Sequence, residues 1–388
     1  MKKSFIFVLA SSFLLILGTY ISGTILTPYA ISIGATWFQV GVLSGSMYVI
    51  RLMFGTYIGK IADSKGSFTV LKYSLMLYPV IAIAYYFASN MTFLIGARLL
   101  HGIASAMMIP MGMAYIGEIS PKGSEGSYMG IYNLCIIAAS GAGPMISTMV
   151  ASYYGYGAAF SILFILAAVS LIIIQFCKED KQESETKEKA EIKKINKSSI
   201  YLLKNKKLLA LGSANFAMAV TSSLIGFFIL PYLKNIGIES RYTGSIVAVY
   251  YLVCGIFQIY AGKFIDSHSK LRVSLFSGIL ISILLMCFII SKNVLIVCIC
   301  IIITALCSVV FQTSINSLSV IEGRQYGMGQ TMGFINTANS AGMIFCCIML
   351  GIMPVSADNY CPFFIFSAIA NIIFVLGFRL CYRKKNID

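Results

Sequence analysis

Charged residues are scarce in this chain. They make up 11% of its 388 residues, whereas soluble domains carry about 25%. The 14 aspartates and glutamates all fall in loops, at the ends of apolar runs, in one central polar segment or at the C-terminus. None lies in the middle of an apolar run. The composition excludes an ordinary soluble domain, and the sequence offers no paired carboxylates for acid–base catalysis.

Histidine is scarcer still, with only His101 and His268. Two separated histidines do not suggest a zinc site or a hydrolase triad. The 11 cysteines lie almost entirely within apolar runs and form no C-x-x-C pair, so most are interpreted as packing residues. We therefore expect no metal and no cofactor, and we do not expect an enzyme.

The chain consists mainly of long hydrophobic runs. Hydrophobic residues make up 58% of the sequence, and its mean hydropathy is +0.86. About twenty apolar residues cross the hydrocarbon core as a helix. The sequence predicts an all-α polytopic membrane protein with twelve transmembrane helices, placed near 5–32, 39–61, 69–88, 92–117, 126–151, 156–177, 208–232, 242–264, 271–291, 294–320, 329–352 and 358–380.

The basic residues predict the orientation of these helices. Among 29 lysines and arginines, Lys234, Arg241 and Lys292 fall on one side of the membrane, Arg51 and Arg98 lie inside apolar runs, and all the others fall on the opposite side. This is the positive-inside pattern. We expect a multi-pass protein of the cell membrane with both termini in the cytoplasm. The net charge of +15 then reflects topology in a lipid bilayer and not nucleic-acid binding. The first apolar run is too long for a signal peptide.

One long polar segment divides the chain. Residues 178–199 carry lysines and acids with almost no large apolar side chains, so they cannot form a buried core. We expect an N-terminal six-helix bundle at 1–177, a charged cytoplasmic linker at 178–207 and a C-terminal six-helix bundle at 208–388.

The two predicted bundles share a repeat. Residues 28–64 align without a gap on residues 231–267, with 12 identities in 37 positions. The alignment ends in a turn that reads Gly-Lys-Ile-Ala-Asp-Ser-Lys-Gly at 59–66 and Gly-Lys-Phe-Ile-Asp-Ser at 262–267. A repeat of this length predicts two similar halves. Asp63 can serve as an N-cap or face the N-terminus of another helix, where the dipole favours negative charge.

The turn resembles motif A of the major facilitator superfamily, G-x-L-A-D-R-x-G-R-K. Gly59, Asp63 and Gly66 match it, whereas Ser64, Ser67 and Phe68 replace basic positions. The resemblance implies the twelve-helix fold of that family, in two pseudo-symmetric bundles. It also implies gate residues, which are expected to be Gly59, Asp63, Gly66, Asp266 and the two acids near helix ends, Glu118 and Glu322. For Glu118 and Glu322, a solvated helix end is the alternative.

Two further stretches resemble motifs of proton-coupled exporters. Residues 98–102, Arg-Leu-Leu-His-Gly, resemble motif B. Gly130, Gly143 and Pro144 match motif C of the drug/proton antiporters, although Ala139, Ser147 and Thr148 replace three of its glycines. The resemblance implies proton-coupled export; ordinary packing of small residues is the alternative for motif C.

Ionisable residues inside membrane helices are costly and usually functional. Arg51 and His101 are predicted near the midplane, where such transporters bind substrate, with Arg98 closer to the outer end. Alternatively, Arg51 is a structural strut, Arg98 snorkels outward, and His101 makes a buried polar contact. Polar residues on the other helices expected to line the cavity are further candidates for substrate binding, with hydrogen bonding between helices as the alternative for each: Tyr48, Asn133, Asn215, Gln258, Gln312, Asn336 and Asn339.

These observations predict a secondary transporter that exports a small molecule by alternating access, with protons as the coupling ion and the protein as a monomer. An intramembrane arginine without a carboxylate favours an anionic, zwitterionic or neutral polar cargo over a cationic drug. A multidrug efflux pump and an uptake transporter are the alternatives. Proton coupling has no obvious carrier, and His101, Glu118 and Asp63 are the available groups. A membrane enzyme would show a nucleophile–base set, and a sensor would carry an output domain; neither is found.

Overall fold

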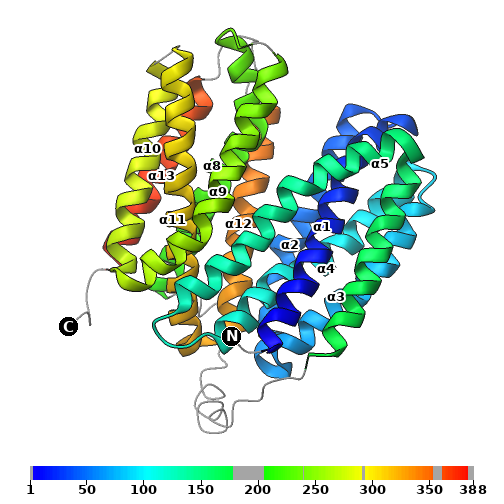
Figure 1. Ribbon diagram of the computed structural model, residues 1–388, viewed down its shortest axis with the longest axis horizontal. Coiled ribbons are helices and arrows are strands. Elements are labelled where there is room, and N and C mark those ends of the chain that lie inside the picture. Colours follow the sequence, from blue (N-terminus) through cyan, green and yellow to red (C-terminus); the bar gives the residue numbers. More distant parts are fainter. Residues whose placement is uncertain (1–2, 178–204, 239, 291–292, 353–360, 383–388) are drawn as a thin grey trace. The chain divides into compact units, whose positions relative to one another are not determined.

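The computed structural model describes residues 3–177, 205–238, 240–290, 293–352 and 361–382, and these residues are almost entirely helical (Figure 1). The described residues contain no β-strand. The helices are α1 (Lys3–Ser32), α2 (Trp37–Lys65), α3 (Ser67–Tyr86), α4 (Met91–Ile119), α5 (Glu125–Gln175), α8 (Lys206–Asn235), α9 (Ser240–Ser267), α10 (Lys270–Ile290), α11 (Val294–Tyr326), α12 (Met328–Ile352) and α13 (Cys361–Tyr382).

The long helix α5 contains the fifth and sixth predicted helices. Its helical backbone is interrupted at Gly155, where φ is 79° and ψ is 173°. A positive φ is unfavourable for residues with a side chain, so a glycine at this position lets the chain change direction. All twelve predicted helical segments are thus present in the described residues, and the predicted all-α fold is confirmed. Most of the predicted linker, residues 178–204, lies outside the described residues.

Several helices extend beyond the predicted apolar runs. The second helix reaches Lys65 instead of residue 61, and the tenth reaches Tyr326 instead of residue 320. The prediction ended each helix where apolar residues end, but backbone hydrogen bonding continues through polar residues outside the hydrocarbon layer. Asp63 and Glu322 therefore lie within the last turns of helices and not in loops.

Seven helices of the described part of the chain are long and apolar enough to cross a membrane. Helix α3 shows why they need lipid. Leu71, Leu75 and Tyr78 on one face are almost completely buried, while Met76 and Val80 on the other face are about half exposed. An apolar face exposed along a whole helix is unfavourable in water and favourable against lipid chains.

The chain divides into two compact units. The first comprises Met1–Ser120, Tyr132–Ser199 and Glu322–Thr337, and the second comprises Pro121–Ile131, Ile200–Ile321 and Ala338–Asp388. The first unit therefore contains the end of α11 and the beginning of α12, and the second contains the beginning of α5. Each unit combines residues from both halves of the sequence.

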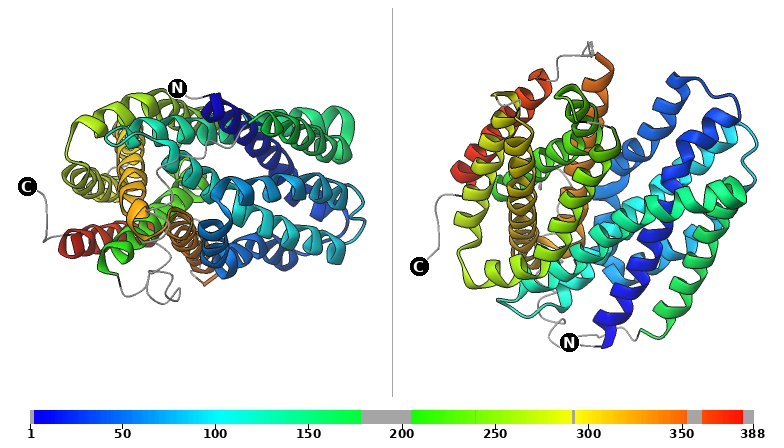
Figure 2. Two further views of the ribbon diagram at one scale, coloured as in Figure 1. Left: turned by 90° about the horizontal axis from the view of Figure 1, so that it is seen from below. Right: turned by 45° about the horizontal axis from the view of Figure 1, so that its top comes forward.

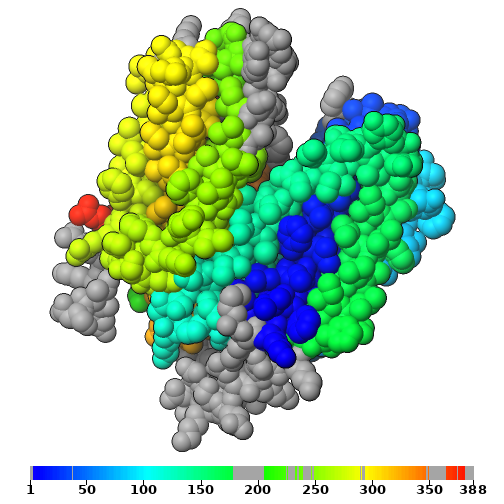
Figure 3. Space-filling view, in the orientation of Figure 1, coloured from blue at the N-terminus to red at the C-terminus, as the bar shows by residue number. Residues whose placement is uncertain are grey.

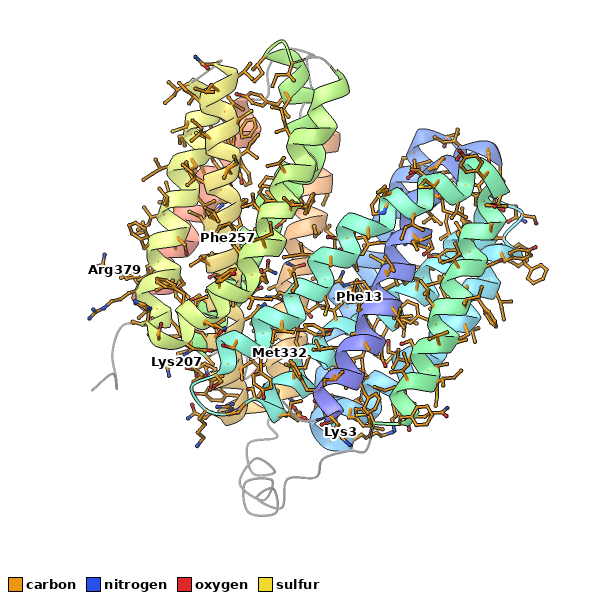
Figure 4. The ribbon with its side chains drawn as sticks, in the orientation of Figure 1. Lys3, Phe13, Lys207, Phe257, Met332 and Arg379 are labelled. Carbon is orange, nitrogen blue, oxygen red and sulfur yellow. The ribbon has the colours of Figure 1, made fainter. Side chains whose placement is uncertain are left out.

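In the first unit, α4 packs against α2, α3 and α1. Helix α1, whose beginning at Lys3 and middle at Phe13 are marked in Figure 4, also contacts both parts of α5. Figure 3 shows its surface between the α5 segments on either side of the kink. A Cβ atom at Gly18 would lie 3.0 Å from Leu163, and Ser11 and Ser170 exchange hydrogen bonds between their hydroxyls and carbonyls.

In the second unit, α13 packs against α8 and α10 (Figure 2). The Tyr232 hydroxyl of α8 donates a hydrogen bond to the Phe288 carbonyl of α10 at 2.5 Å. The ring of Phe364 of α13 packs against both Tyr232 and Phe288. This aromatic cluster fixes three helices at one end of the unit.

Candidate functional site

The last turn of α2 places the Asp63 carboxylate at the beginning of α12, within the first unit. Its Oδ1 accepts a hydrogen bond from the Gly329 amide at 2.6 Å, and its Oδ2 accepts one from the Gln330 amide at 3.0 Å. The first amides of a helix have no intrahelical acceptor, and the helix dipole attracts negative charge there. Asp63 thus faces the N-terminus of α12, a helix far away in the sequence.

Asp266, at the end of α9, makes the same contact in the second unit. Its carboxylate accepts hydrogen bonds from the Gly126 amide at 2.7 Å and the Ser127 amide at 2.8 Å, at the beginning of α5. The Ser127 hydroxyl donates a third hydrogen bond at 2.6 Å. The sequence repeat is therefore also a repeat of contacts.

Glycines allow the close approach behind each carboxylate. A Cβ atom at Gly59 would collide with the Gly329 carbonyl oxygen, and one at Gly333 would lie 2.5 Å from the Gly55 carbonyl oxygen. In the second unit, a Cβ atom at Gly262 would lie 2.6 Å from the Gly126 carbonyl oxygen. Distances this short exclude any side chain unless the backbones separate.

Gly66 ends the first of these turns with φ of 92°. Its amide donates to the Ala62 carbonyl at 2.7 Å, which closes α2 before α3 begins at Ser67. The residue at this position needs a positive φ, for which glycine is the favoured choice.

The other predicted gate acids differ in environment. Glu118 is exposed and accepts a hydrogen bond from the Ser67 hydroxyl at 2.7 Å. Glu322 is buried within α11, with 4% of its surface exposed. Near it in sequence, Arg324 donates a hydrogen bond to the Ser120 carbonyl at 2.6 Å. Glu118 thus joins α4 to α3, and Arg324 joins α11 to the end of α4.

Arg51 lies buried on α2, in the first unit. Its Nη2 donates a hydrogen bond to the Asn336 Oδ1 at 2.6 Å, and its guanidinium lies over the Tyr48 ring, 5.7 Å from the ring centre. The Nε atom is buried and has no hydrogen-bond partner among the described residues. No carboxylate in the described part of the chain pairs with this cation.

A second basic group lies on α4 beside α3. The Nδ1 atom of His101 is 3.0 Å from the Tyr85 hydroxyl and 3.5 Å from an amino group of Arg98. The ring of Tyr78 packs edge-on against the imidazole. Arg51 lies close enough to interact electrostatically with both Arg98 and Tyr78, so the three predicted ionisable residues form one cluster. We call Arg51, Arg98, His101, Tyr48 and Asn336 the basic cluster.

The remaining polar candidates do not all join the basic cluster. The amide of Asn215 donates to the Leu211 carbonyl of its own helix at 3.0 Å. Gln258 donates to the Thr313 hydroxyl at 2.6 Å and links α9 to α11 in the second unit. Asn133 is buried on α5, whereas Gln312 on α11 and Asn339 on α12 are half-buried.

The segment that resembles motif C holds α1 within the first unit. A Cβ atom at Gly143 would collide with Tyr20 of α1, and the Ser147 hydroxyl donates to the Ile21 carbonyl at 2.6 Å. Pro144 lies inside α5 between these contacts. Gly130 belongs to the second unit, where its Cβ would lie 3.0 Å from the Gln258 carbonyl oxygen. The two matched glycines thus serve different contacts.

Sequence reasoning did not identify Tyr78, Tyr85 or Glu125. The two tyrosines are completely buried beside His101; their spacing of seven residues on one predicted helix was the available signal. Glu125 is buried and lies 3.8 Å from the Lys270 ammonium. An acid in the first turn of a helix was the signal for Glu125. Within the described residues, no group of three or more His, Cys, Asp or Glu side chains could hold a metal ion.

Comparison with known proteins gives consistent matches. The family model described as Major Facilitator Superfamily matches residues 8–345 and 211–386. The chain is 27% identical over 359 residues to an uncharacterized MFS-type transporter of Methanocaldococcus jannaschii, covering 91% of this chain and 92% of that one. It is 26% identical over 223 residues to the multi-drug resistance efflux pump PmrA homolog of Lactococcus lactis, covering 56% and 54%. The structure of the proton:xylose symporter XylE superposes with a TM-score of 0.79 at 12% identity, over 98% of this chain and 95% of that one.

Proposed function

The chain belongs to the Major Facilitator Superfamily, and we propose that it exports a small anionic, zwitterionic or neutral polar molecule in exchange for protons. Membership makes the protein a multi-pass membrane transporter and not an enzyme. We further propose that it works as a monomer in the cell membrane by alternating access, with both termini in the cytoplasm. The positive-inside pattern of the sequence supports this orientation.

The environment of Arg51 carries the proposal on cargo. The guanidinium is buried, and its partners in the described residues are a neutral amide and an aromatic face. Arg98 adds a second positive charge nearby. Burying charge without a counter-ion is costly. A carboxylate or phosphate on the cargo would lower that cost, because either group binds a guanidinium through two parallel hydrogen bonds.

A cargo carboxylate could replace Asn336 as the hydrogen-bond acceptor of Arg51. The Asn336 Oδ1 occupies one donor of Arg51, and a neutral amide is a weaker acceptor than a carboxylate. A cargo carboxylate would therefore displace the amide oxygen and also reach the buried Nε. The Tyr48 ring would hold the Arg51 guanidinium in the same orientation while its hydrogen-bond acceptor changes from Asn336 to the cargo.

We propose that His101 binds the coupling proton. It is the sole histidine of the basic cluster, and its ring nitrogen contacts the Tyr85 hydroxyl, which can donate or accept a proton. Protonated His101 would be repelled by Arg98 and Arg51.

Two features favour export as the direction. The PmrA homolog, which resembles just over half of this chain, is named as an efflux pump. The segment that resembles motif C packs closely against α1 through Gly143 and Ser147. The carboxylates of Asp63 and Asp266 would act as latches at the starts of α12 and α5, which must be released as the transporter changes state.

Uptake into inside-out vesicles tests this proposal. Vesicles that contain the protein are incubated in a medium with radiolabelled organic anions, zwitterions or quaternary ammonium compounds, with and without an imposed proton gradient. We expect accumulation of an anionic, zwitterionic or neutral polar compound that requires the gradient. Accumulation that is independent of the gradient for every compound would contradict proton-coupled export.

Multidrug efflux is the second candidate, because the name of the Lactococcus lactis relative favours it. A lipophilic cation would approach two arginines with no carboxylate of the cluster to balance its charge. Strong gradient-dependent transport of quaternary ammonium compounds, with no transport of anions, would favour this candidate.

A further inference from the structure

Helices α10 and α11 of the second unit run antiparallel to each other in a defined register. Near the beginning of α10, the Lys270 carbonyl accepts a hydrogen bond from the Ser314 hydroxyl of α11 at 2.6 Å. Two turns further along α10, a Cβ atom at Gly278 would lie 3.0 Å from the Phe311 ring. In such a pair, a residue further along α10 faces one earlier in α11. Cys287 of α10 therefore lies level with residues near 300 of α11.

Cys300 occupies that position. The Cys287 thiol lies close enough to the Cys300 thiol to interact with it electrostatically, and both are free thiols. Cys300 is buried with 7% of its surface exposed, while Cys287 is half-buried. Cys298 is also half-buried, but it lies two residues before Cys300 and so points roughly 200° away around the helix. The register and the proximity of the two thiols thus select one pair among the cysteines.

We propose that Cys287 and Cys300 form a reversible dithiol–disulfide site that reacts with low-molecular-weight disulfides. The half-buried Cys287 thiolate attacks one sulfur of the small disulfide, forms a mixed disulfide and releases one small thiolate. The Cys300 thiolate then attacks the Cys287 sulfur and releases the second small thiolate. The two protein thiols are oxidised, the small disulfide is reduced to two thiols, and both protons go to the released thiolates.

The apolar surroundings favour this product over a metal complex. The neighbouring residues Phe288, Val297 and Ile301 are almost completely buried. A disulfide is neutral and requires no counter-ion. A monovalent soft metal held by two thiolates would leave a net negative charge in the same place, which is costly without a partner. The bond would tie the end of α10 to the beginning of α11, independently of the basic cluster in the first unit.

Treatment of the purified full-length protein with dithiodipyridine tests the site. We expect two thiopyridone molecules to be released by this pair, and a linked peptide that joins residues 287 and 300 after digestion. Dithiothreitol should separate the linked peptides. The measurement uses the unmodified chain, so it does not depend on any variant folding.

Single substitutions provide the matched controls. Cys298→Ser should keep the link, whereas Cys287→Ser and Cys300→Ser should each abolish it and leave a thiopyridine adduct on the remaining partner. Adducts on both Cys287 and Cys300 in the unmodified chain would overturn the proposal. So would a link from Cys287 to Cys298, or two thiols that react only after the protein is denatured.

Discussion

Asp63 and Asp266 are 203 residues apart, and each accepts hydrogen bonds from a pair of consecutive backbone amides. The two pairs of amides are also 203 residues apart. Asp63 receives the Gly329 and Gln330 amides, and Asp266 receives the Gly126 and Ser127 amides. In both cases these amides belong to the second and third residues of a helix. A contact repeated with this accuracy within each unit indicates a shared role.

Replacing the charge in one of these contacts tests that role. Asp63→Asn keeps an oxygen that accepts a hydrogen bond but loses the negative charge at the start of α12. Because hydrogen bonds to charged groups contribute about 1.5 to 3 kcal/mol, we expect a fall in transport turnover of about tenfold or more with little change in cargo affinity. Turnover is measured in proteoliposomes and affinity by ligand-induced fluorescence.

Two further variants frame this result. Asp266→Asn should behave like Asp63→Asn because it removes the equivalent charge. Ser64→Ala is the neutral control, because the exposed Ser64 hydroxyl bonds only to the Ile61 carbonyl of its own helix. Lost cargo binding with normal turnover in Asp63→Asn would instead place Asp63 in the substrate site.

The glycines behind Asp63 give a second prediction. Gly59→Ala would push a methyl group into the Gly329 carbonyl, and overpacking of this kind costs about 1 to 3 kcal/mol. Gly45→Ala on the same helix is the matched control, since a Cβ atom there meets nothing within 4 Å. We expect Gly59→Ala alone to lower thermal stability and transport. Equal effects of the two variants would show that helix propensity, and not close approach, decides the outcome.

Arg51 provides the test of cargo charge. Arg51→Ala should reduce transport of the true cargo by about ten- to a hundredfold, the range expected for a lost charge-assisted hydrogen bond. Arg51→Lys should retain part of it, because the charge remains without the bidentate fork. Initial rates in vesicles measure both. Efficient export of quaternary ammonium compounds by the native protein and by Arg51→Ala alike would make Arg51 a structural strut.

His101 provides the test of proton coupling. His101→Gln keeps a polar side chain of similar reach but cannot carry a proton near neutral pH. We expect it to lose accumulation driven by a proton gradient while it still exchanges labelled for unlabelled cargo. Tyr85→Phe, which removes the hydroxyl 3.0 Å from the imidazole, should weaken coupling less. Unchanged gradient-driven accumulation in His101→Gln would assign the proton to Asp63 or Glu118.

Cysteine labelling tests the proposed orientation. In a cysteine-free background, Ser89→Cys and Tyr154→Cys should react with an impermeant maleimide added outside cells, because both residues are exposed and lie on predicted outer links. Ser184→Cys, in the linker outside the described residues, should react only after the membrane is opened. External labelling at residue 184 would invert the topology.

The turns at Asp63 and Asp266 could be predicted because their signals are local. A charged, glycine-bounded link between two apolar runs defines a hairpin, and its repetition at a fixed offset defines a pair of equivalent sites. The same offset relates Gly126 to Gly329 and Gly130 to Gly333, so the partners of both aspartates were also within reach of the sequence.

The basic cluster was predictable only in part. Arg51, Arg98 and His101 stand out because charge is costly in apolar helices. Their pairing does not stand out: Asn336, itself a candidate, lies 285 residues from Arg51. Which face of α3 brings Tyr78 and Tyr85 to His101 depends on packing against α4. The change of direction at Gly155 falls in the break that the sequence predicts between residues 151 and 156, although the glycine itself was not singled out.

Residues 322–337 belong to the first compact unit, although they come late in the chain. During synthesis, the first unit must therefore wait for α12 before it is complete. Until Gly329 and Gln330 are made, the Asp63 carboxylate lacks the two amides that it binds in the finished protein. We therefore expect the first unit to complete its folding late in biogenesis, when the beginning of α12 packs against the N-terminal helices that were made earlier.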